Sequence, residues 1–369
     1  MVRKSIKFLM KINNLKLINF RNYKKLEIDL NEGINLIYGD NASGKTNLVE
    51  SIVLCSIGKS FRTNEDNSLI RHNQDFARID LEYQINKKNS IKFVVSKIGK
   101  NVEINDIKIN RLSKLSGNLL TITFVPEDVT MFKDSPGVRR RFLDISISGL
   151  EKDYIDNLLD YKNYLRQRNA LLKEENVDLI LLETIEERML ESQFVISNYR
   201  RNIVSDLEKE LKIIFNKINQ RENQIQIKYV SDFAAFKPYE EFKKTTREKY
   251  LETRENDLKK KNTSIGIHRD DLKIYFNNLD IGEYASQGQN RLMVLSLKLA
   301  LARLIKEKVK EDPIIILDDV LSELDNSHQD CLIKELKNYE QVFITSAKKE
   351  EMENVSKYHV VDNLIIRGN

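Results

Sequence analysis

The chain has 369 residues, of which 32% are charged, and its formal net charge is +5. This length can bury a full hydrophobic core and provides for about two or three structural units. Every apolar run is shorter than the ~18 residues that a membrane span requires, so we expect no membrane association. A modest positive balance without a long basic run permits nucleic-acid binding and does not require it.

Neither end of the sequence nor its cysteines point to secretion. The basic segment MVRKSIKFLMK has an apolar part too short for a secretory signal. The strand pattern begins only at Leu15, so Met10 could be an alternative start to Met1. Cys55 and Cys331 have no metal-binding spacing. We therefore expect a cytoplasmic protein with reduced thiols.

Short runs rich in β-branched residues alternate with polar turns between residues 13 and 125. They predict β-strands, and their hairpin-length spacing predicts an antiparallel sheet beside a phosphate-binding unit. A helix-compatible run at 47–54 interrupts them. The predicted strands are LKLINF, KLEIDL, INLIYG, ARIDLEYQI, IKFVVS, VEINDIKI and LLTITFV.

The stretch NLIYGDNASGKTNLVE, residues 35–50, has the spacing of a phosphate-binding loop between a strand and a helix. Gly39 and Gly44 enclose four residues, and Lys45 and Thr46 follow. Backbone N–H groups of such a loop surround a polyphosphate, and glycine permits the closest approach. We expect Lys45 to reach the β- and γ-phosphates and Thr46 to ligate Mg²⁺. The alternative is a glycine-containing turn with an incidental lysine.

The middle of the chain is predicted to be helical. Glycine is absent between Gly149 and Gly266. Apolar residues recur there at helical steps, which predicts two or three long helices over 151–220, projecting as an arm. An insertion packed flat on the core is the alternative. A strand-like NQIQIKYV follows, and then a charged stretch at 240–262 that predicts a solvated helix or helix pair.

Strands and helices alternate again in the last third. NRLMVLSLKLALARLIKEKV is apolar on almost every side, which predicts a buried helix, and QVFIT and NLIIRG predict strands. PIIILDDV predicts a buried parallel strand that ends in Asp318 and Asp319. Parallel sheets bind ligands at the carboxyl ends of their strands, so we expect Asp318 to hold Mg²⁺ and Asp319 to polarise an attacking water. Paired acids also cap helices and begin turns, which is the alternative.

A second anion-binding pattern precedes the buried helix. Ser286, Gln287, Gly288 and Gln289 offer a hydroxyl, a close-approach glycine and a helix N-terminus. A monomer that already cradles its phosphates in the first loop does not need this second site. We therefore expect Ser286 of one subunit to face the γ-phosphate held by another, whereas a plain helix cap is the alternative.

The ordered set GDNASGKT, SQGQ and ILDDVLSELD resembles the ABC-type ATPase head of SMC-like DNA repair proteins. Within that group the chain resembles the RecF family of bacterial recombination mediators. The segments LINFRNY, IGKSFRT, VPEDVTMFKDSPGVRRRFLD and HRDDL extend the resemblance from about residue 12 to the C-terminus. It implies an α/β fold, an ABC-type P-loop ATPase head with a mixed sheet, an antiparallel β subdomain and an inserted helical arm domain. The implied domains are an N-terminal lobe at 1–150, the arm at 151–262 and a C-terminal lobe at 263–369.

The resemblance also implies roles for single residues. Lys45 and Asp319 would be catalytic, and Thr46 and Asp318 would hold Mg²⁺. The Walker A residues that bind ATP would be Gly39, Asp40, Asn41, Ala42, Ser43, Gly44, Lys45 and Thr46, with Arg21, Asn22 and Tyr23 near the adenine and ribose. The trans-subunit signature would be Ser286, Gln287, Gly288 and Gln289, and the D-loop facing the opposing subunit would run from Ser322 to Asp325.

Two positions depart from the family pattern. Ala347 stands where a switch histidine is expected, so Thr345 or Ser346 substitutes for it or hydrolysis is slow. Ile267 replaces the proline of a Gly-Pro-His pattern, which bears on the stiffness of that loop and on a direct role for His268.

In function, the resemblance implies an ATP-dependent homodimer that binds DNA at single-strand gaps and double-strand/single-strand junctions. It implies slow, DNA-stimulated ATP hydrolysis, and recombinase loading with RecO- and RecR-like mediators. Candidate phosphate contacts are Lys59, Arg62, Arg139, Arg140 and Arg141, which would fix position without reading bases. At least one arginine of the 139–141 cluster is expected to pair within the molecule.

Two other ATPase functions remain open. A transporter nucleotide-binding subunit would not suit the helical insertion or the charged 240–261 stretch. A phage-defence ATPase fused to a nuclease needs a further acidic metal site, and about 45 residues after the D-loop are too few for another domain. A long SMC or zinc-hook protein is excluded by the short arm and the absence of a CxxC pair.

Overall fold

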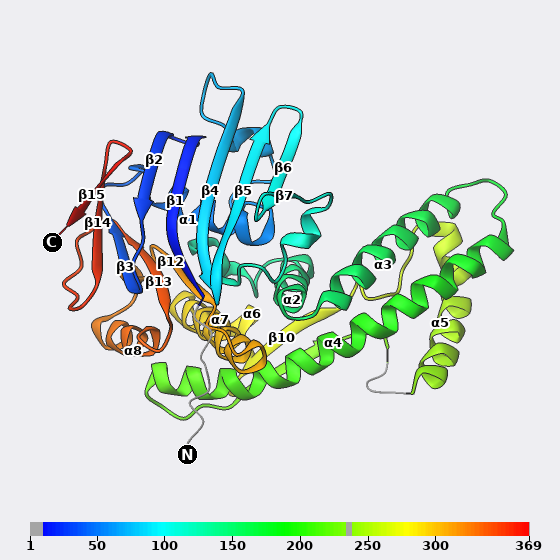
Figure 1. The fold of residues 1–369 in the computed structure, drawn as a ribbon. Helices are drawn as coiled ribbons and strands as arrows, with labels where there is room; N and C mark the ends of the chain where they lie inside the picture. Colours follow the sequence, from blue (N-terminus) through cyan, green and yellow to red (C-terminus); the bar gives the residue numbers. More distant parts are fainter. Residues whose placement is uncertain (1–9, 234–237, 369) are drawn as a thin grey trace, which may run out of the picture. The chain divides into compact units, whose positions relative to one another are not determined.

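The computed structural model describes residues 10–233 and 238–368 (Figure 1). The chain forms two compact units that alternate along the sequence. The first, called the head unit here, comprises Met1–Val129, Ile213–Arg221 and Gln287–Asn369; the second, the helical unit, comprises Thr130–Lys212 and Glu222–Ser286. The boundaries predicted after residues 150 and 262 therefore fall inside the helical unit. α2 (Pro136–Leu150) packs on α3 (Lys152–Leu171) and on β10 (Asp271–Phe276), and the predicted division into three domains stays a prediction.

An antiparallel sheet forms one layer of the head unit, and Figure 1 shows most of its strands side by side. Its order is β2-β1-β4-β5-β6-β7. In β4, Ala77, Ile79, Leu81 and Tyr83 alternate with less buried residues, as expected of a sheet with one face on the core. The strands are β1 (Lys11–Phe20), β2 (Tyr23–Asp29), β4 (Phe76–Ile85), β5 (Lys87–Ser96), β6 (Gly99–Ile104) and β7 (Ile107–Lys108).

The predicted antiparallel strands are confirmed, with one difference at the start. The first strand begins at Lys11 rather than Leu15. Met10 just before it is fully buried, and the backbone N–H of Leu120 points to its sulfur at 3.3 Å. The sequence pattern missed this end because polar Asn13 and Asn14 interrupt the alternation where β1 shifts register against β4.

A mixed sheet forms the second layer, in the order β15-β14-β3-β13-β12-β8. All its neighbours are parallel except the β14–β15 hairpin. Every residue of β12 is buried, which confirms the predicted buried parallel strand. The strands are β3 (Gly33–Tyr38), β8 (Thr121–Phe124), β12 (Ile314–Asp318), β13 (Gln341–Ser346), β14 (Ser356–Val361) and β15 (Leu364–Gly368).

Helix α1 lies between the two sheets of the head unit. It contacts β4 and β5 of the antiparallel sheet and β8, β12 and β13 of the mixed sheet. The predicted buried helix is also confirmed, because one continuous run of α7 from Leu292 to Ala302 is buried. The head helices are α1 (Lys45–Ile57), α7 (Gln287–Val309) and α8 (Asn326–Leu336).

The helical unit contains the helices predicted between residues 151 and 262, whereas their arrangement as an arm stays a prediction. The charged stretch forms one helix, α5, with only four buried residues. The elements are α2, α3 (Lys152–Leu171), α4 (Leu179–Asn219), β9 (Ile225–Val230), α5 (Tyr239–Lys260), β10 (Asp271–Phe276), β11 (Leu279–Asp280) and α6 (Ile281–Tyr284). The end of α4, from Ile213 on, belongs to the head unit. In the described ranges, no helix is both long and apolar enough to cross a membrane.

Buried ion pairs join the helices of this unit. Arg168 of α3 has no exposed surface, and it binds Glu186 of α4 and Asp257 of α5 at 2.8 Å each. The Arg168 guanidinium also donates to the hydroxyl of Thr263 at 2.8 Å. A buried charge is tolerated only when it is paired and hydrogen-bonded, so this residue holds three segments in register.

We predict that Arg168→Ala lowers the free energy of unfolding by about 3–5 kcal/mol, because it leaves the buried carboxylate of Asp257 without its cation and Glu186 with Arg254 alone. Urea denaturation followed by circular dichroism measures the change. The matched control is Arg188→Ala, which removes an exposed i,i+3 pair with Glu191 and is expected to cost less than about 1 kcal/mol. Equal losses in the two variants would contradict the assignment.

Candidate nucleotide-binding site

The glycine loop between β3 and α1 has the backbone shape of a phosphate cradle. Gly39 and Gly44 have φ angles of 149° and 118°, which side chains rarely permit. A Cβ on Gly39 would lie 2.3 Å from the carbonyl oxygen of Val360, and a Cβ on Gly44 would lie 2.8 Å from the hydroxyl of Tyr23. Both positions therefore require glycine.

Lys45 lies inside this loop. Its side chain is buried, and its Nζ donates to the carbonyl oxygens of Gly39 at 2.7 Å and Asp40 at 2.8 Å. Burial lowers the pKa of Lys45, whereas the charges of Asp319, Asp318 and Asp40 act in the opposite direction. An ammonium group in this position faces the volume that the loop encloses.

Asp318 joins the glycine loop to the end of β12. Its Oδ1 accepts hydrogen bonds from Thr46 Oγ1 at 3.0 Å and from Thr345 Oγ1 at 2.6 Å. Burial raises the pKa of Asp318, and the two threonine bonds oppose that rise. The contact arises because β3, β13 and β12 are parallel neighbours whose carboxyl ends meet at one edge.

Asp319 follows at a strained position. Its φ is 52°, in the left-handed region that non-glycine residues rarely adopt, and such strain clusters at functional sites. Its backbone N–H donates to Thr345 Oγ1 at 3.0 Å, and its Oδ1 accepts from Ser322 Oγ at 3.3 Å. These bonds fix the turn at Asp319 and hold its carboxyl beside Ser322.

The residues near the expected switch histidine have other partners. Thr345 is buried and bound to Asp318. Ser346 Oγ donates to Glu350 at 2.8 Å, and Ala347 is exposed. The hydroxyls of Thr345 and Ser346 thus donate to protein carboxylates in this structure. That one of these two residues takes the role of the switch histidine stays a prediction.

The loop fits a polyphosphate and the acidic pair fits Mg²⁺. Within the described chain, the Ser43 Oγ is buried in the loop and has no hydrogen-bond partner, as a donor aimed at an anion would be. Thr46 Oγ1 and Asp318 Oδ1 are hard oxygen atoms, the type that Mg²⁺ prefers, and lie 3.0 Å apart.

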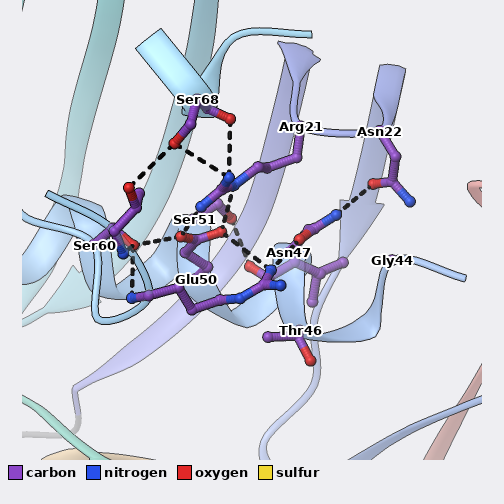
Figure 2. A network of polar contacts seen from close by, with 12 residues as sticks. Arg21, Asn22, Gly44, Thr46, Asn47, Glu50, Ser51, Ser60 and Ser68 are labelled. Carbon is purple, nitrogen blue, oxygen red and sulfur yellow. Dashed lines mark hydrogen bonds and ion pairs between the residues drawn. The ribbon is translucent and has the colours of Figure 1, made fainter. Parts of the chain in front are cut away.

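The residues expected near adenine and ribose lie beside the loop (Figure 2). Tyr23 is fully buried, and its hydroxyl donates to the carbonyl oxygen of Gly44 at 3.1 Å, so it supports the loop from behind. Asn22 Oδ1 accepts from Asn47 of α1 at 2.8 Å. Arg21 binds Glu50 through two hydrogen bonds. Contact of Arg21 and Asn22 with a base stays a prediction.

The predicted signature and D-loop residues lie at the surface. Ser286, Gln287, Gly288 and Gln289 are all exposed, and α7 begins directly after Ser286. Ser322 is exposed and bound to Asp319. Asp325 caps α8, and the backbone N–H of His328 lowers the pKa of its carboxyl. Exposure leaves all of them accessible to a second molecule.

The candidate DNA contacts separate into exposed and enclosed residues. Lys59, Arg62 and Arg141 are exposed, and Arg140 is half-buried with one bond to the carbonyl oxygen of Asp270. Arg139 is enclosed. Its guanidinium binds both carboxylate oxygens of Asp271, at 2.7 and 2.9 Å, and donates to the carbonyl oxygens of residues 131 and 134.

The prediction of a phosphate contact is therefore wrong for Arg139. All its donors point inward, and freeing them would leave Asp271 without its cation. The expectation that one arginine of the cluster pairs within the molecule is confirmed.

His268 likewise has internal partners. Its Nδ1 lies 2.8 Å from the hydroxyl of Tyr161, and its Nε2 lies 3.3 Å from the carbonyl oxygen of Thr263. Burial lowers the pKa of His268 to about 4, so the ring is neutral at physiological pH.

Sequence reasoning missed Glu50, Asn47 and Ser60, which form a hydrogen-bond network with Arg21 and Asn22. Glu50 is fully buried and interrupts the apolar run LVESIVLCSI of α1. A charge inside an otherwise apolar helix was the signal that could have identified it, since such a charge requires a partner.

We predict that Asp318→Asn raises the free energy of unfolding of the nucleotide-free chain at pH 7. Because folding raises the pKa of Asp318, its ionised form costs stability at pH 7, and that cost declines as the pH falls through the raised folded pKa and is gone below the unfolded pKa of about 4. Urea denaturation at pH 7 and at a pH below about 4 measures the difference in the free energy of unfolding between Asp318→Asn and the parent chain. The exposed Asp330→Asn is the control; a less stable Asp318→Asn chain at pH 7 would refute the prediction.

Comparison with known proteins gives a consistent result. Residues 11–131 match the family model described as RecF/RecN/SMC N terminal domain. The structure is similar to a solved structure of the recombination mediator protein RecF with ATP in the RecFOR pathway, with a TM-score of 0.93, 31% identity and 100% of both chains covered. It also shares its fold with the Smc head domain of Pyrococcus furiosus, at a TM-score of 0.56 and 18% identity over 97% of this chain and 96% of that one. The fold is thus that of an ABC-type ATPase head.

A curated relative covers almost the whole sequence. The DNA replication and repair protein RecF of Clostridium perfringens (strain SM101) is 38% identical over 363 residues, which are 96% of this chain and 99% of the relative. A relative from Clostridioides difficile (strain 630) is 38% identical over 344 residues, 92% of each chain. The chain belongs to the RecF family of DNA replication and repair proteins.

Proposed function

We propose that the chain is an ATP-dependent DNA-binding protein of recombinational repair and replication. Its family is one of ABC-type ATPases. The observation that carries the proposal is the Thr46–Asp318 hydrogen bond of 3.0 Å beside an enclosed Lys45, which joins the phosphate loop to the acidic pair. The ATP of a solved RecF structure and the repair role in the names of its relatives support this proposal.

The residues of the loop would divide the work of holding a triphosphate. Lys45 would exchange its two loop carbonyls for phosphate oxygens and neutralise their charge. Thr46 and Asp318 would hold Mg²⁺, which supplies charge neutralisation across the phosphates when bound. Asp319, held at its turn by Thr345 and Ser322, would orient and polarise the attacking water. With no histidine at 347, we expect slow hydrolysis that DNA stimulates.

The signature residues would act in a second subunit. Ser286 is exposed and precedes a helix of 23 residues, so its hydroxyl and the helix N-terminus can meet the γ-phosphate of a facing copy. ATP would then close a homodimer, and hydrolysis would reopen it. Ser322 and Asp325 are exposed D-loop residues that would meet the same partner.

The dimer would bind DNA at single-strand gaps and double-strand/single-strand junctions. Lys59, Arg62, Arg140 and Arg141 would contact phosphates without reading bases. We further propose cooperation with RecO- and RecR-like mediators in loading recombinase in the cytoplasm, in line with the RecFOR pathway of the solved relative.

Sedimentation with ATP, without ATP, and with ATP plus gapped DNA tests the function directly. We expect a monomer without ATP, a dimer with it, and a DNA complex that weakens as salt rises. If the chain binds ATP and does not bind DNA at low salt, the result would favour the alternative function. That alternative is another SMC-like or ABC-type ATPase, such as a transporter subunit or a phage-defence protein.

We predict that Lys45→Arg lowers the rate of ATP hydrolysis by ~10²-fold or more, because a planar guanidinium cannot take the place of the enclosed ammonium. Phosphate release at saturating ATP measures it. Lys25→Arg, at an exposed lysine of β2, is the control and is expected to keep the parent rate. Unchanged turnover in the Lys45 variant would refute the cradle.

We predict that Ser286→Arg abolishes the ATP-dependent dimer while each monomer still binds ATP, because the new side chain would occupy the place of the facing phosphates. Sedimentation and nucleotide titration measure the two properties separately. Ser205→Arg, at an exposed serine of α4, is the matched control. A normal ATP dimer of the Ser286 variant would rule out the role in a facing subunit.

A further inference from the structure

Glu50 is a buried negative charge directly behind the phosphate loop. It lies on α1, five positions after Lys45, and none of its surface is exposed. Ionising a carboxyl in such a place is costly unless cations and hydrogen-bond donors surround it. Glu50 therefore depends on its partners, and their positions depend on Glu50.

The first partner is Arg21, in the turn between β1 and β2 (Figure 2). Its Nε and Nη2 donate to the two carboxylate oxygens of Glu50 at 2.9 and 2.7 Å. Its Nη1 donates to the carbonyl oxygen of Ser68 at 2.9 Å. A bidentate pair of this kind fixes both direction and distance, so α1, the β1–β2 turn and residue 68 are held together.

The second set of partners comes from residues 59–68, called the basic loop here after Lys59 and Arg62, although it also carries Glu65 and Asp66. Ser60 Oγ donates to Glu50 Oε1 at 2.5 Å and accepts the backbone N–H groups of Arg62 at 2.9 Å and Thr63 at 3.1 Å. One hydroxyl thus fastens the turn of the loop to the buried carboxylate.

Arg62 is held twice at its guanidinium. Its Nη1 donates to Asn47 Oδ1 at 2.8 Å and lies 3.9 Å from Glu50 Oε2. Asn47 is adjacent to Thr46 in the first turns of α1 and also donates to Asn22 at 2.8 Å. The same rigid helix therefore carries the phosphate-binding residues and the anchors of the basic loop.

The charges leave Arg62 able to bind an anion. One carboxylate faces two guanidinium groups, Arg21 takes both its oxygens at short distance, and Arg62 keeps 41% of its side chain exposed.

We propose that Glu50 is a positioning residue that couples nucleotide binding to DNA binding by tying the basic loop to the helix of the phosphate loop. The inference rests on the proposed function, because it needs both ligands. A shift of α1 around a triphosphate would move Ser60 and Arg62 with it, and a DNA phosphate held by Arg62 would act back on α1. By linkage, each ligand changes the affinity for the other by one common factor.

The experiment measures that factor in the full chain. A fluorescent ATP analogue with Mg²⁺ is titrated with and without saturating gapped DNA at fixed low salt, and the ratio of the two Kd values is the coupling factor. For the parent chain we expect about 5- to 150-fold, the usual range of such couplings. In Glu50→Gln, an amide donor faces Arg21 in place of an acceptor, so we expect both ligands still to bind and the factor to fall close to one.

The control is Glu186→Gln, which breaks another buried Arg–Glu pair far from the loop in sequence and is expected to keep the coupling factor. A parent chain without coupling would refute the proposed linkage between the ligands themselves. A coupled parent with a coupled Glu50→Gln variant would refute only the role of Glu50.

A second variant keeps the test decisive if Glu50→Gln unfolds. Ser60→Ala removes the hydroxyl that ties the turn of the basic loop to Glu50 and leaves the Arg21–Glu50 pair intact. We expect it to fold, to bind ATP as the parent does, and to lose most of the coupling. Coupling equal to that of the parent chain in folded Ser60→Ala would overturn the proposal.

Discussion

Helix α1 is confined between two sheets, and the nucleotide site depends on this confinement. Its residues from Leu48 to Ser56 are buried, including Glu50 and Cys55. A helix enclosed in this way has little freedom to move alone, because protein interiors are close-packed. The phosphate loop is therefore attached to a rigid helix. A displacement of the loop would move this helix and the side chains that project from it.

The parallel register of the mixed sheet supplies the second part of the site. β3 ends at the glycine loop, β12 ends at Asp318, and β13 between them provides Thr345. Because these strands are adjacent, Thr46 and Asp318 form a hydrogen bond although they are 272 positions apart in the sequence. The cost of this arrangement is a buried carboxyl with a raised pKa, and strain at Asp319. Such costs are typical of functional sites, where stability yields to a required geometry.

In both units, buried ion pairs determine which arginines serve packing and which stay accessible to a ligand. Arg139, Arg168 and Arg200 are buried against aspartate or glutamate in the helical unit, and Arg21 is held by Glu50 in the head unit. Arg62 and Lys59 stay exposed. The net charge of +5 therefore does not say which arginines serve packing and which can meet a polyanion.

The sequence by itself determined the strands, the glycine loop, the buried helix and the acidic pair, because each is written in a local period or spacing that backbone geometry requires. Only the tertiary structure decided which charges are buried, where the units divide and that Glu50 binds Arg21. Arg139 meets Asp271 across 132 positions, and Arg21 meets Glu50 across 29. The partner of a side chain depends on how distant elements pack, and no local pattern in the chain records that packing.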